Sequence, residues 1–372
     1  MTHMNQLAIK IYRIPGLLLV LMMISFLNLF GQPLANDFEK MQGSRFSFTI
    51  DDPADSLSSK EFIELRDENG LPRWFGRYFH KVVCLTGECR MVHIWLYWDG
   101  AGNYLGFEPD EKEPLTKTDH HDFSEADYRK LHSILADSVS VLKSLKQEDL
   151  IILPEKKEQQ LKVDAISGAT RQYLQDYLIR NAAYTCYTLW HTVYGTTRER
   201  IQNQLEARLN AEFLGKIFQL KDPVLQVWAI HAVGKHPEYT SRFTENILLL
   251  VKSDNNEVAH AALNYFTPAR ISDPGIQQQM AQSVGEAVSQ IRFEIIWKLK
   301  SLPRISNESI GILLDFYLQQ KIYAGLLGYI FDMIHAENLK DPAILQQVKK
   351  LAKDKNPYVR NLAAKIRAEV KK

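Results

Sequence analysis

Hydrophobic and polar positions change their period along the chain. An apolar run from Ile14 to Phe30 follows Lys10 and Arg13. Beyond it, apolar residues first alternate with a period of two, as in strands, and later recur every three or four positions, as in helices. We therefore predict an N-terminal α+β domain with a small antiparallel sheet, followed by an all-α solenoid. The predicted boundaries are residues 1–35 for a targeting segment, 36–197 for the α+β domain and 198–372 for the helical region.

The strand signal is strongest between residues 80 and 107. In Arg90–Trp98, two sets of apolar and aromatic residues alternate, which is typical of a sheet. His80–Cys84 and Tyr104–Phe107 are predicted as its neighbours, joined through glycine-containing turns. Phe46–Ile50 alternates like a further short strand, whereas the rest of residues 36–75 shows no clear period.

Two helices are predicted to complete the first domain. Ser124 and Asp127 have the spacing of a capping box, which predicts a helix to about Ala136. A second helical pattern opens at Ser167 and continues to about Tyr194.

The start of this second pattern contains the candidate functional residues. Ser167 is a good N-cap, and Gly168 permits close backbone approach. The unpaired amides of a helix start, together with the helix dipole, attract phosphate. Thr170 would present its hydroxyl in the first turn, beside that phosphate.

These residues resemble the FMN-binding domain family, which includes the C subunit of the sodium-translocating NADH:quinone oxidoreductase and the G subunit of the Rnf complex. In that family a flavin transferase joins FMN, through its phosphate, to the threonine of a D-x-x-S-G-A-T segment. The motif positions are held here by Asp164, Ser167, Gly168, Ala169 and Thr170. The resemblance implies covalent FMN on Thr170 and recognition of the segment by a flavin transferase. The alternatives are non-covalent FMN binding and a capped helix start without a ligand.

An aromatic stripe follows on the same predicted helix, from Tyr184 through Tyr187 and Trp190 or His191 to Tyr194. Residues spaced three or four apart share one helix face. The stripe is either a wall for the flavin ring or part of the core, and burial in the core is the commoner use of such a face.

From Arg198 onward the amphipathic segments repeat. Apolar helices begin near residues 224, 258, 291, 322 and 359, roughly 31 to 37 residues apart, and a leading helix precedes each. This spacing, with Asp-Pro or Asn-Pro turns, resembles HEAT-type repeats, whose neighbours stack into a solenoid that binds partners. A plain helical bundle is the alternative.

The N-terminal run reads as a secretory signal peptide or a retained membrane anchor, and either one predicts export to an extracytoplasmic, periplasmic location. Export permits a disulfide, and Cys84 and Cys89 flank a predicted turn, so we favour a disulfide over two thiols. Cys186 is expected to be buried in a helix. His120 and His121 lack the spacing of zinc ligands, so solvent-facing histidines are favoured over a metal site.

A net charge of +1 gives no reason to expect a nucleic-acid partner. The predicted function is an exported electron-transfer flavoprotein, more an electron carrier than an enzyme with its own substrate. It would dock to an unidentified redox protein or membrane complex through the helical repeats. A cofactor-free interaction protein is the alternative.

Overall fold

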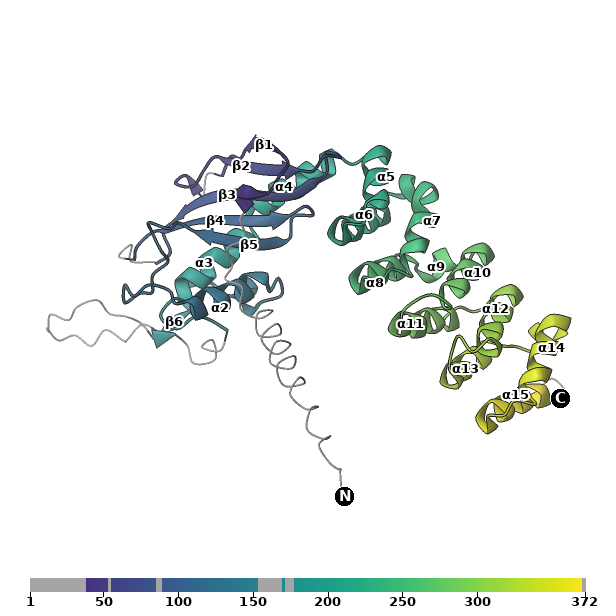
Figure 1. Ribbon diagram of the computed structural model, residues 1–372. Coiled ribbons are helices and arrows are strands. Elements are labelled where there is room, and N and C mark those ends of the chain that lie inside the picture. Colours follow the sequence, from purple (N-terminus) through teal and green to yellow (C-terminus); the bar gives the residue numbers. More distant parts are fainter. Residues whose placement is uncertain (1–37, 53–54, 85–88, 153–168, 171–176, 370–372) are drawn as a thin grey trace, which may run out of the picture. The chain divides into compact units, whose positions relative to one another are not determined.

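The computed structural model describes residues 38–52, 55–84, 89–152, 169–170 and 177–369. The chain divides into two compact units, Met1–Ala207 and Arg208–Lys372 (Figure 1). The first contains a five-stranded sheet with helices, and the described part of the second is helical, so the predicted fold class is confirmed. The apolar run at 14–30 lies outside the described residues. No helix within the described ranges is long and apolar enough to cross a membrane.

The main sheet of the first unit is antiparallel throughout, with its strands in chain order. The strands are β1 (Ser44–Thr49), β2 (Glu61–Arg66), β3 (Pro72–Lys81), β4 (Val92–Asp99) and β5 (Tyr104–Pro109). The strands predicted near residues 46–50, 90–98 and 104–107 are confirmed. β2 was not predicted. The bounds predicted for the strand at His80–Cys84 are wrong, because β3 begins at Pro72 and ends at Lys81. Most residues of β3 are buried, which hides the period of two.

Both faces of the sheet are covered. On one face, the buried Trp98 donates from Nε1 to the Val193 carbonyl at 2.9 Å, which ties β4 to the end of a helix. On the other face, the 3-10 helix η1 (Phe38–Lys40) places the Phe38 ring on Tyr97, with ring centroids 3.9 Å apart. The core therefore extends through both sides of the central strands.

The remaining elements of the first unit are mostly helical. They are α2 (Glu125–Ala136), η3 (Val141–Ser144), η4 (Gln147–Asp149), the short antiparallel pair β6 (Ile151–Ile152) and β7 (Ala169–Thr170), α3 (Ala183–Val193) and α4 (Thr196–Ala207). The capping box that begins α2 is confirmed: the Asp127 amide donates to the Ser124 hydroxyl, and the Ser124 amide donates to the Asp127 carboxylate.

The predicted continuous helix from Ser167 to Tyr194 is wrong. Thr170 lies in strand β7, paired with Ile151, and α3 starts only at Ala183. Asn181 has a φ of 59°, a left-handed conformation that an α-helix cannot contain. Contacts to another segment hold Asn181 there, since its side-chain amide donates to Asp119 at 3.0 Å. Tertiary contacts therefore override the helical periodicity before residue 183.

The second unit is built from consecutive helix pairs. The leading helices are α5 (Ala211–Gln219), α7 (Thr240–Leu250), α10 (Pro274–Ser283), α12 (Asn307–Leu318) and α14 (Pro342–Leu351). The following helices are α6 (Pro223–Lys235), α8 (Asn256–Tyr265), α11 (Ser289–Lys300), α13 (Ala324–Phe331) and α15 (Pro357–Glu369), and the short α9 (Pro268–Ile271) lies between two pairs. Within each pair the helices pack on each other, and α6, α10, α11, α12 and α13 each pack on the equivalent helix of the next pair. The predicted helix positions are confirmed, whereas membership of the HEAT class stays a prediction.

Candidate functional site

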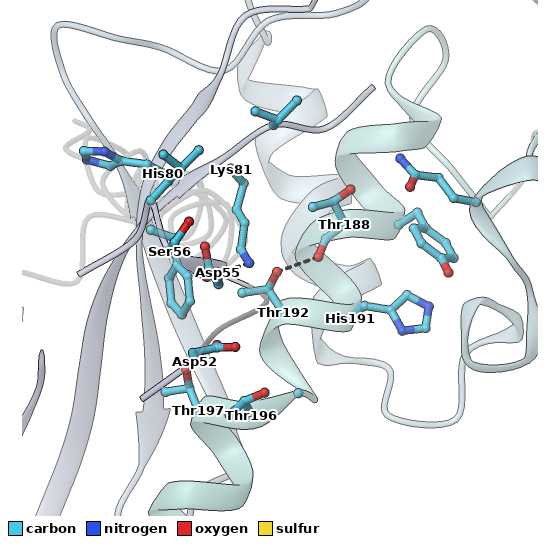
Figure 2. A pocket seen from close by; sticks show the side chains of 16 residues that line it. Asp52, Asp55, Ser56, His80, Lys81, Thr188, His191, Thr192, Thr196 and Thr197 are labelled. Atoms are coloured by element: carbon cyan, nitrogen blue, oxygen red, sulfur yellow. Dashed lines mark hydrogen bonds and ion pairs between the residues drawn. The ribbon is translucent and has the colours of Figure 1, made fainter. Parts of the chain in front are cut away.

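A cavity of about 430 Å³ lies in the first unit, where the end of β3 faces the junction of α3 and α4 (Figure 2). A cavity of this volume falls within the range of small-molecule sites, about 300–1,000 Å³. Its walls come from the chain after β1, the end of β3, η4 and the α3–α4 junction. The lining residues are Asp52, Asp55, Ser56, Leu57, Phe79, His80, Lys81, Val82, Gln147, Tyr187, Thr188, His191, Thr192, Gly195, Thr196 and Thr197.

Lys81 supplies the ammonium group of this cavity. Its Nζ lies 2.6 Å from Oδ2 of Asp55, whose side chain is only 5% exposed. The other oxygen of that carboxylate accepts from the Ser58 hydroxyl at 2.8 Å. In Figure 2, the Lys81 side chain extends between Asp55 and the side of α3 that carries Thr188 and Thr192. Asp55 thus holds the ammonium group against the hydroxyl-bearing wall.

A second, more deeply buried cation pairs with residues of the wall without lining the cavity itself. Arg77, on β3, is 1% exposed and lies 3.3 Å from the Asp52 carboxylate. It also donates to the Thr197 hydroxyl and to the Ser59 carbonyl, both at 2.8 Å. Both carboxylates in the wall are therefore neutralised, Asp52 by Arg77 and Asp55 by Lys81. A neutral ligand ring can enter without meeting an unpaired buried charge.

The α3 wall is polar but has few charged groups. The Thr192 hydroxyl donates to the Thr188 carbonyl at 2.7 Å, one helical turn back. His191 Nε2 lies 3.0 Å from the Leu142 carbonyl, and because a carbonyl only accepts, Nε2 carries the hydrogen. Burial lowers the pKa of His191, more than the bond to Leu142 raises it. The ring is therefore neutral at pH 7.

The structure describes two of the five motif residues. Asp164, Ser167 and Gly168 lie outside the described residues. Ala169 and Thr170 form β7, and the Thr170 backbone pairs with Ile151. Ile151 follows Gln147 of the cavity wall by four residues, so the Thr170 and Gln147 backbones are about 16 Å apart at most. Thr170 is thus held near the cavity, although its place at a helix start was predicted wrongly.

The aromatic stripe on α3 is divided between two environments. Tyr187 and His191 line the cavity. Trp190 donates to the Asp137 carbonyl at 2.9 Å and Tyr194 donates to the Leu135 carbonyl at 2.8 Å, so both pack on the end of α2. Burial raises the pKa of Tyr184, and charge interactions with Cys84 and Cys89 raise it further. The core interpretation is confirmed for Trp190 and Tyr194, whereas a role of Tyr187 and His191 as a flavin wall stays a prediction.

The predicted disulfide between Cys84 and Cys89 is not formed in this structure. The two residues are nevertheless adjacent, because the Cys89 amide donates to Cys84 Sγ at 3.0 Å. Cys186 is buried in α3, as predicted.

The predicted solvent-facing position of His121 is confirmed: its side chain is 79% exposed and pairs with Asp119. Across the described ranges, no group of three His, Cys, Asp or Glu side chains is arranged to hold a metal ion.

Sequence reasoning missed the charged part of the site. Asp52, Asp55, Arg77 and Lys81 are separated by up to 29 positions, and they converge only because β3 runs back past the chain that follows β1. A weak signal was present, since Arg77 interrupts the apolar stretch of β3 and a cation in a buried strand needs a partner.

Comparisons with known proteins do not assign this chain to a family. No protein-family model matches this chain, and no curated protein matches it.

Proposed function

We propose that this chain is an extracytoplasmic electron-transfer flavoprotein that carries FMN on Thr170, with the flavin ring in the cavity between β3 and α3. The observation that carries the proposal is the coincidence of a D-x-x-S-G-A-T segment with a nearby cavity of ligand size. The β6–β7 pairing supports it, because it keeps Thr170 within about 16 Å of the Gln147 backbone. This separation is comparable with the length of an FMN molecule.

The residues present fit a flavin. A flavin ring is planar and largely apolar, with hydrogen-bonding atoms along one edge. The cavity offers apolar contact from Leu57, Phe79 and Val82, and hydroxyl groups from Thr188 and Thr192. When bound, FMN supplies one- or two-electron transfer, and the protein supplies binding, orientation and electrostatics.

Individual residues of the cavity wall then have specific roles in binding the flavin. Lys81, held by Asp55 in a neutral ion pair, offers ammonium N–H groups that can donate to a ligand in the cavity. The neutral His191 offers Nδ1 as an acceptor, because Nε2 is committed to the Leu142 carbonyl. The role that we propose is that of an electron carrier, more than that of an enzyme with its own substrate.

The test is in-gel fluorescence of the denatured protein after export from a host that supplies the flavin transferase. We expect a fluorescent band for the natural sequence and none for Thr170→Ala. Ser144→Ala is the matched control, because this exposed hydroxyl outside the motif should leave the fluorescence unchanged. A fluorescent Thr170→Ala band would contradict attachment at Thr170. Yellow protein that loses its colour on denaturation would indicate non-covalent FMN.

A cluster of exposed aromatic rings favours a second role, docking to a partner protein, for the helical unit. Trp297 is 56% exposed and Phe293 is 38% exposed, both on α11, and their rings stack at 6.3 Å. Tyr329 of α13 lies edge-on to each of them. Aromatic side chains are enriched at protein interfaces, and they often carry much of the binding energy.

The charge nearest to this cluster is paired: Lys300 lies over the Trp297 and Tyr329 rings, and its Nζ is 2.6 Å from the Asp332 carboxylate. We therefore propose a protein partner with an apolar patch that covers the rings. The test places a photo-crosslinking residue at position 297, with position 249 as the control, because Leu249 is 63% exposed on α7. A discrete crosslinked protein at 297 alone supports the role, and its absence contradicts it.

A further inference from the structure

Cys84 and Cys89 lie at equal distances along the chain beyond the last residue pair of the β3–β4 ladder. The last pair of that ladder is Lys81 with Val92. Cys84 follows Lys81 by three residues and Cys89 precedes Val92 by three, so a continued register would pair them directly. Side chains paired in this way have Cβ atoms about 4.5–5.5 Å apart, close to the separation that a disulfide needs.

The contact between the two residues agrees with this register. The Cys89 amide nitrogen lies 3.0 Å from Cys84 Sγ. With standard bond lengths, this contact keeps the two Cα atoms within about 7 Å, near the upper limit for a disulfide. The separation of the two residues is therefore compatible with a disulfide.

Tyr184, on α3, interacts electrostatically with both cysteines: burial raises its pKa first, and Cys84 and Cys89 then raise it further. Cys186, two residues further along α3, is fully buried, and burial raises the pKa of its thiol to about 12. Because the thiolate is the reactive form, Cys186 is protected from exchange.

We propose that Cys84 and Cys89 are a reversible dithiol–disulfide couple at the edge of the cavity. A thiolate of the pair attacks a small-molecule disulfide such as oxidised glutathione, and one glutathione thiolate leaves. The second cysteine thiolate then displaces the other glutathione from the mixed disulfide. In the net reaction two protein thiols and one oxidised glutathione become one protein disulfide and two reduced glutathiones. The couple is independent of the proposed flavin.

The couple is connected to the cavity wall. Val82, two residues before Cys84, lines the cavity, and the Val83 carbonyl accepts from the Gln147 side chain at 2.8 Å. Closing a six-residue loop removes freedom mainly from the unfolded chain. The oxidised form should therefore melt about 5 °C higher than the reduced form.

The test equilibrates the full chain in glutathione buffers from fully reduced to fully oxidised. Acid quenching, alkylation under denaturing conditions and peptide mass mapping follow. We expect a linked Cys84–Cys89 peptide in oxidising buffer, with two hydrogens lost and Cys186 alkylated throughout. In reducing buffer, all three cysteines should be alkylated.

Two variants keep the result interpretable. Cys186→Ala should oxidise like the natural sequence. In Cys84→Ser, Cys89 should end as a thiol or a glutathione adduct, and the melting temperature should no longer depend on the buffer. The proposal is overturned if Cys84 and Cys89 of the natural sequence remain alkylatable, or carry one glutathione each, after equilibration in oxidising buffer.

Discussion

Arg77 and Thr197 join the sheet of the first unit to helix α4. The Arg77 guanidinium, on β3, donates to the Thr197 hydroxyl at 2.8 Å, and both residues are almost completely buried. The same guanidinium pairs with Asp52, which lines the cavity. One side chain therefore fixes three segments around the proposed flavin site.

Replacing Arg77 should be costly. Arg77→Met removes the partner of the Asp52 carboxylate and leaves Thr197 without its donor. Breaking a buried ion pair from one side costs about 3–5 kcal/mol. Urea unfolding of the full chain should show this loss in the free energy of unfolding. Thr197→Val, which removes one hydroxyl only, should cost about 1 kcal/mol. Equal effects of the two variants would contradict the central role of Arg77.

The capping box of α2 predicts a stability change that depends on pH. Burial acts to raise the pKa of Asp127, but bonds from Ser124 and Lys117 together hold it below its usual value. Ser124→Ala should cost about 1 kcal/mol at pH 7. A carboxyl with a lowered pKa stabilises the fold above the pKa of the unfolded state, and this contribution disappears as the pH falls through the folded value. The difference between the two proteins should therefore shrink below about pH 4. A difference that is constant from pH 7 to pH 3 would exclude this linkage.

His191 predicts a second pH effect, at higher pH. Its lowered pKa means that the unfolded chain binds a proton before the folded chain does. The stability from the neutral ring is complete above about pH 6.5 and is lost as the pH falls through the folded value. Unfolding free energies of the natural sequence and His191→Gln should therefore converge as the pH drops from 7.5 to 5. Nitrogen-15 NMR of the folded protein should also show hydrogen on Nε2 at pH 7, and hydrogen on Nδ1 instead would refute the assigned tautomer.

Two glycines should respond in opposite directions to alanine. Gly215 lies in the middle of α5, and an added Cβ would meet nothing within 4 Å. Gly215→Ala should stabilise the helical unit by about 0.5–1 kcal/mol, because alanine is the better helix former. At Gly76, an added Cβ would lie 2.8 Å from the Tyr97 ring, which is buried. Gly76→Ala should therefore destabilise the first unit by about 1–3 kcal/mol. Thermal unfolding of both variants checks this contrast, and a change of the same sign in both would refute it.

Much of the fold could be predicted from the sequence because many of its signals are local. The alternation in β4, the Ser124–Asp127 cap and the repeated helix starts depend only on neighbours in the chain. β2 and the start of α3 could not be predicted. β2 was missed because two charged residues, the paired Glu64 and Arg66, interrupt its apolar pattern. The start of α3 was missed because it depends on the bond from Asn181 to Asp119, which joins segments that are distant in the sequence.

The candidate site, like the fold, could be predicted from the sequence only in part. The attachment segment at 164–170 is a contiguous motif and is visible in the sequence. The wall around Lys81 and Asp55 depends on β3 passing the chain after β1, which the local pattern does not encode.

The central claim is that FMN is joined to Thr170, and mass spectrometry of a tryptic peptide tests it most directly. Trypsin cuts after Lys162 and Arg171 and releases Val163–Arg171, which contains the whole motif. After export from a host with an active flavin transferase, we predict that this peptide gains the mass of one FMN less one water. Fragmentation should place the added group on Thr170 and not on Ser167. An unmodified peptide, with a control protein flavinylated in the same cells, would contradict the claim.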